Sequence, residues 1–280
     1  MKLHTKQTLQ RIFLWLAVVV FLSIFILLPF YWMVKTSFES TANLFSYPPA
    51  VFIKDFVSVG WKSLFFDQPV LTWLKNSLIV SNVVMVVSML LATLSAYSLS
   101  RYHNKLNKTI GFLVLVTQML PGTLFMLPIY TTFSKMGLVN SYAGCMIAFT
   151  TFSLPICMWM LKGYFDSVPI EIEQAAHIDG CSRLGALFKV VLPLALPGYV
   201  CTAIFGFINS WNEYMMSFVL MTNSSKWLMS NGLASFIGEF STPWNTVMAA
   251  ALVYTLPPVI LFMFLQKYLV QGLTAGSVKG

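Results

Sequence analysis

Six apolar stretches of about 20 residues or more divide this chain, and each is long enough to cross a bilayer as a helix. They lie near residues 12–34, 72–99, 110–133, 141–162, 197–221 and 246–267. Hydrophobic residues make up 58% of the sequence and charged residues only 9%, whereas a typical soluble domain has about 25% charged residues. The lipid bilayer is therefore the expected solvent, and the expected fold is an all-α membrane protein with six transmembrane helices.

The first apolar stretch has the features of a retained span. A signal peptide has an apolar core of about 7–15 residues followed by a small-residue cleavage site. The run from Ile12 to Val34 is longer, and it includes Phe30, Tyr31 and Trp32, which are typical of a membrane boundary. We therefore predict that residues 1–34 form a cytoplasmic N-terminus and the first span.

The distribution of Lys and Arg predicts the orientation of the chain. With both termini inside, eleven of these cations lie on inner segments and six on outer segments, in agreement with the positive-inside rule. This bias also accounts for the net charge of +8 without a nucleic-acid partner. The predicted parts are then an extracytoplasmic loop at 35–71, a core transmembrane domain at 72–267 and a cytoplasmic tail at 268–280.

A polar segment at residues 166–195 interrupts the apolar pattern on the inner side, and it is too long for a simple turn. Pro169 suits the first turn of a helix, and Gly180 can adopt the left-handed conformation that ends one. Ser182 can cap a second short helix, before Pro193 bends the chain back into the membrane. The pair could lie on lipid, but it carries two cations against three acids, and lipid-binding helices are usually richer in Lys and Arg. A soluble protein partner is the favoured interpretation.

The first of these two helices combines acids with small apolar residues. Glu171 and Glu173 lie near its N-terminus, where carboxylates complement the helix dipole. Ile172, Ala175 and Ala176 recur at helical spacing and form one small apolar face.

The same segment resembles the EAA loop of binding-protein-dependent ABC importer permeases. That motif reads E-A-A, three residues, G, nine residues, I, any residue, L-P. Here Gln174-Ala175-Ala176 precedes Gly180 at this spacing, and Val190 to Pro193 completes the motif. Gln174 replaces the glutamate of the motif, and Glu173 lies one residue earlier.

Further segments resemble the MalG-type subunit of carbohydrate importers, which have a type I, MetI-like transmembrane domain. The similarity covers nearly the whole chain from about residue 30, and its most specific element is the tail. The segments are Asn76-Ser77-Leu78, Asp179-Gly180, Trp211-Asn212-Glu213, Gly232 to Phe236 and Gly272 to Gly280.

This resemblance implies a set of partners in a bacterial cytoplasmic membrane. A MalF-type second permease would complete the translocation path, and a cytoplasmic ATPase dimer would bind ATP and Mg. An extracytoplasmic sugar-binding protein would deliver the substrate. This chain itself would then have no catalytic residue, no cofactor and no metal.

The resemblance also assigns contact residues in this sequence. The implied ATPase-docking residues are Gln174, Ala175, Ala176, Ile178, Asp179 and Gly180. The implied ATPase-interface residues of the tail are Leu273, Thr274, Ala275 and Gly276. The loop that would probe the binding protein comprises Gly232, Leu233, Ala234, Ser235 and Phe236.

A candidate substrate path centres on Glu213, which the hydropathy pattern places within the fifth span. An acid at mid-membrane costs about 2.5–3.5 kcal/mol on insertion scales, so it should face the bundle interior. Trp211 and Asn212 beside it offer stacking and hydrogen bonding for a sugar, and Asn76 at the start of the second span joins this set. Asn212 and Glu213 could instead serve only to tie spans together.

Other function classes have weaker support in the sequence. The four cysteines and three histidines show no metal-ligand spacing, and there is no phosphate-binding loop motif. An intramembrane hydrolase would need a paired nucleophile and base, which the spans do not offer. A stand-alone secondary transporter would typically show an internal repeat. Within the importer class, a glycerol-phosphate permease is the nearest alternative.

Overall fold

The computed structural model describes residues 2–238 and 241–275 of the chain. Within this part of the chain the regular elements are helices, and the one β-type feature is an isolated bridge between Glu39 and Phe56. Four helices are long and apolar enough to cross a membrane, and two bent helix pairs raise the number to six if each pair is one span. This confirms the predicted all-α membrane fold. The four long helices are α1 (Lys2–Phe38), α4 (Val70–Arg101), α7 (Tyr142–Asp166) and α14 (Trp244–Ala275).

The predicted third span at 110–133 is not one straight helix. Helix α5 (Lys105–Met119) ends before Pro121, and the following segment is bent from it by 95°. Proline lacks an N–H and disfavours helical geometry in the residue before it, and Leu120 accordingly adopts an extended conformation. The segment after the bend consists of a 3₁₀ turn (Gly122–Phe125) and α6 (Met126–Lys135).

The predicted fifth span at 197–221 is also interrupted. Helix α11 (Leu196–Trp211) is bent by 86° from the segment before it, and it ends ten residues short of the predicted boundary. Helix α12 (Met215–Leu220) follows after a short non-helical link. Glu213 lies in that link, so its predicted position inside a continuous span was wrong.

The chain divides into two compact units, which are described separately. The first comprises residues 1–69 and 235–254, and the second comprises residues 70–234 and 255–280. In the first unit α1 continues to Phe38, past the boundary predicted at residue 34. The short elements after it are α2 (Thr41–Leu44), α3 (Val59–Lys62) and a π-helical turn (Ser63–Asp67).

Glu39 organises the loop that follows α1. Its fully buried carboxylate accepts hydrogen bonds from the backbone N–H groups of Lys54 and Asp55, both at 3.1 Å. It also pairs with Lys35 at 3.4 Å and accepts a bond from Asn43 at 3.2 Å. Burial alone would raise the pKa of Glu39, but these hydrogen bonds outweigh it and lower the pKa to about 2.

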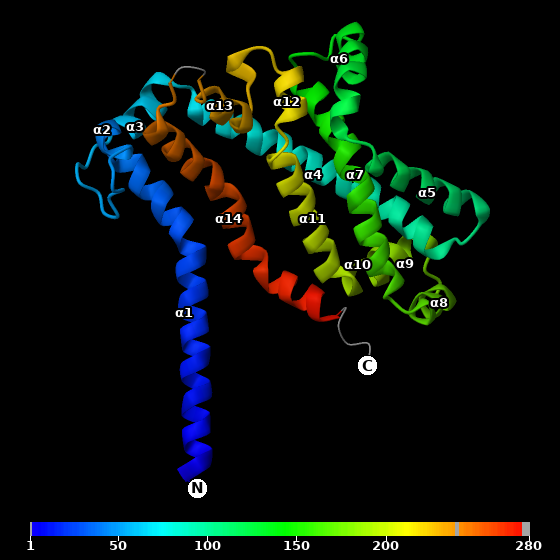
Figure 1. Cartoon of the computed structure of the whole chain (residues 1–280). Helices are drawn as coiled ribbons and strands as arrows, with labels where there is room; N and C mark the ends of the chain where they lie inside the picture. The colour runs from blue at the N-terminus through cyan, green and yellow to red at the C-terminus, as the bar shows by residue number, and fades with distance from the viewer. Residues whose placement is uncertain (1, 239–240, 276–280) are drawn as a thin grey trace. The chain divides into compact units, whose positions relative to one another are not determined.

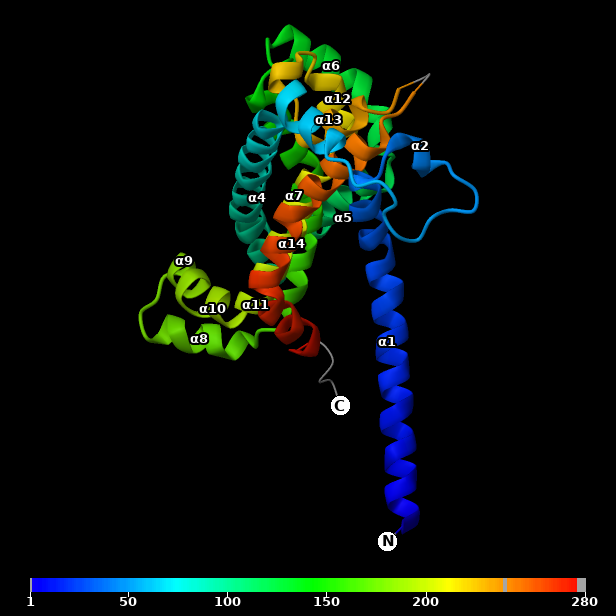
Figure 2. The same ribbon diagram turned by 90° about the vertical axis from the view of Figure 1, so that its left-hand side faces the viewer.

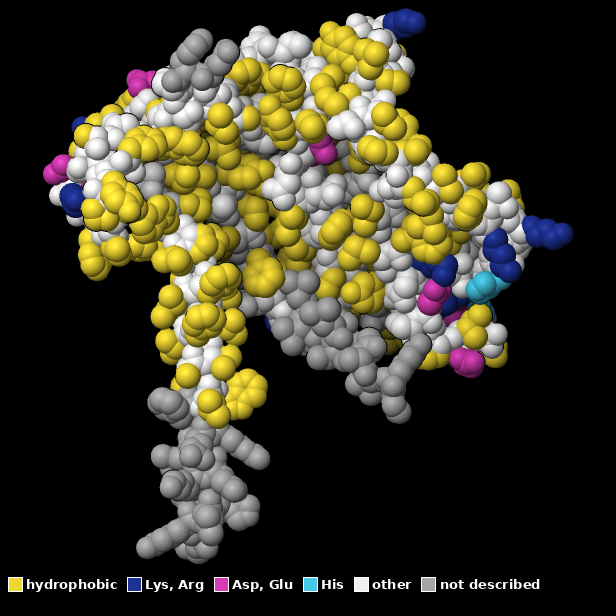
Figure 3. Space-filling view, viewed as in Figure 1, with side chains coloured by type: hydrophobic (Ala, Val, Ile, Leu, Met, Phe, Trp, Pro, Cys, Tyr) yellow, Lys and Arg dark blue, Asp and Glu magenta, His cyan; other side chains and the backbone are white. Residues whose placement is uncertain are grey.

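The second unit is built on three helices, α4, α7 and α11, which lie side by side (Figure 1). The face of α4 buried in this bundle carries small residues, among them Ser81, Ser88, Ala92 and Ala96. Small side chains let transmembrane helices approach closely, which is how such helices gain packing energy without a hydrophobic driving force. The outer face of α4 carries Leu90 and similar residues that are about half exposed, and Figure 3 shows how much of the visible surface is hydrophobic.

The remaining elements of the second unit are short. They cover one end of the bundle or follow the links between the long helices. They are α8 (Ile170–Ile178), α9 (Arg183–Ala186), a π-helical turn (Leu187–Val191), α10 (Leu192–Leu194), a 3₁₀ turn (Ser224–Lys226) and α13 (Met229–Ser235).

Candidate functional site

The polar segment forms a helical hairpin at one end of the second unit, with α8 on one side and α9 and α10 on the other (Figure 2). Gly180 joins the two sides with a φ of 86°, the left-handed conformation predicted for it. Ser182 caps α9 as predicted, since its hydroxyl accepts a bond from the Gly185 N–H at 3.2 Å. Pro169 lies just before the first helical residue of α8 and not within its first turn.

Helix α8 turns its small and apolar side outward. Gln174, Ala175, Asp179 and Gly180 are exposed, and Ala176 is half-buried. Ile178 is 87% exposed, an unusual position for an isoleucine in an ordered helix. These six residues are the ones predicted to dock on an ATPase, and five of them are exposed in the second half of α8 and the turn after it; we call the six the docking surface.

The buried side of α8 is acidic. Glu173 is buried, and its carboxylate forms an ion pair with Arg101 at 2.6 Å and accepts a hydrogen bond from the hydroxyl of Tyr97. His177, one turn further along α8, has a ring nitrogen 3.8 Å from the same carboxylate. From the sequence we predicted only that Glu173 complements the helix dipole, and the ion pair with Arg101 was not predicted.

Arg101 holds three elements together. Its guanidinium binds Glu173 on α8 and also donates to the carbonyl oxygens of Phe165 at 3.1 Å and Val168 at 3.2 Å. Phe165 lies in the last turn of α7, where carbonyl oxygens lack an intrahelical partner, and Val168 lies two residues after the end of that helix. The neighbouring Ser100 donates to Asp166 at 2.6 Å. Sequence reasoning missed Arg101 as a functional residue, although its position as the last residue of a long apolar helix is a detectable signal.

The second side of the hairpin attaches to the core by ordinary apolar packing. Leu187 and Val191 are fully buried and belong to a cluster with Leu161 and Phe165 of α7. Phe188, one residue along, is 49% exposed. The hairpin is therefore anchored on one side by apolar contacts and on the other by the Arg101–Glu173 pair.

A second candidate site lies where the two helix breaks of the bundle meet. A hollow of about 230 Å³ lies beside Glu213, in the link between α11 and α12, and beside the 3₁₀ turn that follows α5. Irregular backbone is tolerated at membrane depth where it lines a cavity or is buried in protein. The lining residues are Gly122, Thr123, Phe152, Glu213, Met215 and Met216.

Glu213 also has a structural role. One carboxylate oxygen accepts a hydrogen bond from the Met216 N–H at 3.0 Å, which satisfies a free donor at the start of α12. Its backbone carbonyl accepts from the Ser230 hydroxyl at 3.3 Å. The carboxylate thus both caps α12 and lines the hollow.

The other predicted path residues lie in different surroundings. Trp211 is buried and stacks on Phe207, with ring centroids 5.6 Å apart. Asn212 is exposed at the end of α11. Asn76 is buried on α4 and donates to the Trp227 carbonyl at 3.0 Å, so it joins α4 to the segment before α13.

The loop predicted to probe a binding protein begins within α13. A Cβ at Gly232 would lie 2.1 Å from the indole ring of Trp73, so only glycine allows this close contact. Trp73 in turn donates to the Ser224 carbonyl at 2.9 Å, and the Ser77 hydroxyl accepts from the Met229 N–H at 2.7 Å. Leu233, Ala234 and Ser235 complete α13, and Phe236 follows it.

The predicted ATPase-interface residues fall at the end of the described chain. The backbone of α14 remains helical through Leu273, Thr274 and Ala275. Gly276 lies outside the described residues. Elsewhere, three of the four cysteines are buried, and within the described ranges there is no cluster of three or more potential metal ligands.

Comparison with known proteins places this geometry in a family. The model of the family described as "Binding-protein-dependent transport system inner membrane component" matches residues 85–275, a range that includes the docking surface and the Arg101–Glu173 pair. The sulfoquinovosyl glycerol transport system permease protein SmoH of Agrobacterium fabrum is 34% identical over 254 residues, covering 91% of this chain and 89% of the relative. The trehalose/maltose transport system permease protein MalG of Thermococcus litoralis is 32% identical over 282 residues, covering 98% and 99% respectively.

A solved structure supports the fold. One chain of a bacterial ABC transporter involved in the import of the acidic polysaccharide alginate superposes with a TM-score of 0.76 and 23% sequence identity. The match covers 92% of this chain and 97% of that chain. Together with the family match, this shows that the chain belongs to the inner-membrane permease components of binding-protein-dependent ABC transport systems.

Proposed function

We propose that this chain forms half of the translocation path of a carbohydrate ABC importer in a bacterial cytoplasmic membrane. A MalF-type second permease would supply the other half, and both termini of this chain would be cytoplasmic. An ATPase dimer, which binds ATP and Mg, would dock on α8. A binding protein would deliver the sugar or oligosaccharide from the opposite side, near α13.

One observation carries this proposal. Helix α8 buries one of its two acids, Glu173, and exposes Ala175 and Ile178. A helix that faced only water would be expected to do the reverse. The arrangement is suited to a partner protein that covers the apolar side of α8 with a groove of its own. Gln174 and Ala175, two residues of the motif shared with importer permeases, are exposed here as well.

Glu213 supports a hydroxylated substrate over a phosphorylated one. A carboxylate that lines the hollow can accept hydrogen bonds from sugar hydroxyls, whereas it would repel a phosphate at the same place. The glycerol-phosphate alternative is tested directly by including that compound among the candidate substrates.

The docking surface can be tested with a matched pair of variants. Ala175→Asp introduces a charge in the centre of the surface, and Ala143→Asp introduces the same charge at an exposed position near the start of α7. We expect Ala175→Asp to abolish co-purification of the ATPase while the membrane helices stay folded, and Ala143→Asp to retain it. Normal ATPase binding by the Ala175→Asp variant would refute the proposed docking surface.

Substrate class is tested with the purified complex in lipid. We expect ATP hydrolysis to rise when one sugar-loaded binding protein is added, and not when glycerol phosphate replaces the sugar. A chain that purifies alone, with no second permease and no ATPase, would contradict the proposed assembly.

A further inference from the structure

A separate hollow lies between the end of α4, α5 and the last third of α7. It has a volume of about 360 Å³ and lies beside none of the residues assigned to docking or to the substrate path. We call it the basic hollow. Its polar and aromatic lining includes Tyr102, His103, Asn107, Lys108, Trp159 and Lys162.

Trp159, which lines the basic hollow, has a hydrogen-bond donor that the protein leaves unused. The indole nitrogen of Trp159 is buried, and no described residue accepts its hydrogen bond. The Trp159 ring lies against α5 at Gly111, where a Cβ would be in ordinary van der Waals contact with it at 3.4 Å. An unpaired buried donor is unfavourable, so an acceptor from outside the chain would stabilise this arrangement.

Two of the residues that line the basic hollow are lysines. Lys108 is exposed at the rim of the basic hollow, and Lys162 lies 5.8 Å from the centre of the Trp159 ring. Asp166 binds Lys162 at 2.6 Å, which occupies one of its three donor positions. The guanidinium of Arg183 lies over the Tyr102 ring at 5.5 Å. Figure 3 shows Lys and Arg side chains gathered at the edge of the molecule where α5 begins.

No acid from the preceding sequence balances this charge, because residues 68–165 contain neither Asp nor Glu. The carboxylates near the basic hollow are those of Asp166 and Glu173, and they are held by Lys162 and Arg101 respectively. The basic hollow therefore favours an anion.

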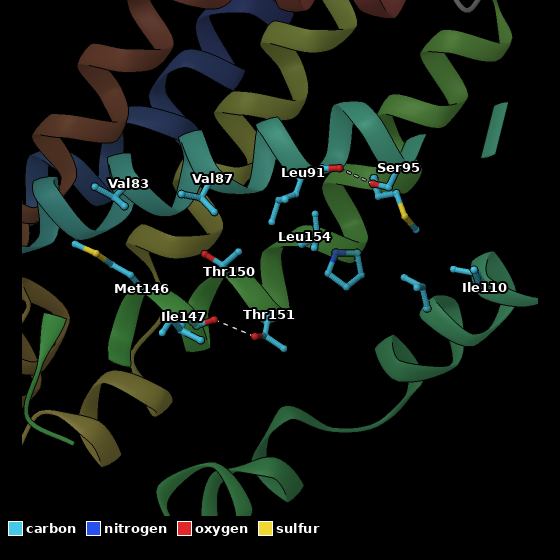
Figure 4. A pocket seen from close by; sticks show the side chains of 13 residues that line it. Val83, Val87, Leu91, Ser95, Ile110, Met146, Ile147, Thr150, Thr151 and Leu154 are labelled. Atoms are coloured by element: carbon cyan, nitrogen blue, oxygen red, sulfur yellow. Dashed lines mark hydrogen bonds between the residues drawn. The ribbon is translucent and has the colours of Figure 1, made fainter. Parts of the chain in front are cut away.

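The same three helices also form an apolar groove of about 590 Å³ (Figure 4). Two of its three lining hydroxyl groups donate within their own helices: that of Ser95 to the Leu91 carbonyl at 2.7 Å, and that of Thr151 to the Ile147 carbonyl at 2.9 Å. Apart from Thr150, the rest of the wall is made of Val, Leu, Ile, Met and Pro side chains. This mainly apolar groove suits hydrocarbon better than a sugar.

We propose that the basic hollow binds the phosphate of an anionic phospholipid, with an acyl chain against the apolar surface of the same three helices. Basic pockets between transmembrane helices at the membrane edge recognise anionic headgroups, and an interfacial Trp is a frequent partner there. A free phosphate would use the donors but not the apolar surface, so a phospholipid accounts for more of the observed features. The inference needs the membrane location that the family establishes, and it does not depend on the docking surface.

The test uses the full chain in nanodiscs that contain phosphatidylglycerol in phosphatidylcholine, with retained lipid counted by native mass spectrometry. We expect selective retention of phosphatidylglycerol. Lys108→Gln should weaken this retention about fivefold, and Trp159→Phe, which keeps an aromatic ring but removes the N–H, about tenfold. Lys105→Gln is the matched control, because this exposed lysine on the same turn does not line the basic hollow.

Three results would overturn the proposal. Equal retention of phosphatidylcholine would show that the site does not recognise the headgroup charge. Equal weakening by Lys105→Gln would show attraction to a diffuse surface charge. Displacement of the lipid by millimolar inorganic phosphate would show a site for a soluble anion. None of these measurements requires an ATPase or a transported sugar, so they are independent of the proposed function.

Discussion

Replacing Arg101 with Met would leave the carboxylate of Glu173 buried without its cation. The side chains of the two residues are only 8% and 7% exposed, so water cannot easily substitute for the lost partner. Removing one member of a buried ion pair typically lowers the free energy of unfolding by about 3–5 kcal/mol. The substitution also removes the donors to the carbonyls of Phe165 and Val168, so we expect a loss toward the upper end of this range.

The double variant Arg101→Met with Glu173→Met separates the ion pair from the general packing of the site. It removes both charges and keeps apolar volume between α4 and α8, and such replacements of buried pairs are often close to neutral. We therefore expect the free energy of unfolding of the double variant to be higher than that of Arg101→Met by about 2 kcal/mol or more. The two carbonyls at the end of α7 remain without their donor, so recovery should be incomplete.

The assay is reversible unfolding of the purified chain in mixed micelles, followed by far-ultraviolet circular dichroism. Lys162→Met is the control, because it breaks a pair with Asp166 at the same 2.6 Å distance but with side chains that are 22% and 41% exposed. We expect Lys162→Met to lower the free energy of unfolding by less than about 1 kcal/mol. The reasoning fails if Lys162→Met costs as much as Arg101→Met, or if the double variant is less stable than the single one.

Three further predictions concern other parts of the chain. Gly232→Ala should destabilise the region around α13 by about 1–3 kcal/mol, because its methyl group would clash with the ring of Trp73, and limited proteolysis should detect the loosening. The pKa of Glu39 lies at about 2, below its ordinary value of 4.5, so its carboxylate stabilises the fold above pH 4.5 and this contribution is lost as pH falls toward 2. The difference in Tm between wild type and Glu39→Gln should therefore become smaller as the pH is lowered from 4.5 toward 2. Glu213→Gln keeps an oxygen that can accept the hydrogen bond from the Met216 N–H, so we expect it to leave Tm nearly unchanged and to lower sugar uptake. Unchanged uptake would show that Glu213 only caps α12.

The local signals of the polar segment were sufficient to predict the local structure. Gly180 and Ser182 act through their own backbone and side-chain chemistry, so their roles at the hairpin turn follow from residue type and spacing. The helix breaks were harder to place. Hydropathy averages over about 20 residues and does not register a bend at Pro121 or a three-residue link at Glu213, because both sides of each break are apolar.

The burial of Glu173 could not be predicted from the pattern of α8. In a helix that faces water, the apolar face of Ile172 and Ala175 would be assigned to the interior. That rule assumes that the outer face meets solvent. A helix that must present its apolar face to a partner protein has to attach to its own bundle by the remaining face, and on α8 that face carries Glu173.

A buried ion pair occupies this position although replacing such pairs by apolar residues often changes stability little. Apolar contacts are non-directional and allow a short helix to roll or slide, whereas the fork of Arg101 fixes α8 against α4 and against the end of α7 by bonds of defined direction. A nine-residue helix makes few contacts and has little rigidity of its own. If α8 receives a displacement from a partner, directional bonds at this point would pass it to the long helices α4 and α7. The pair is therefore better explained by the orientation it imposes on α8 than by the stability it adds.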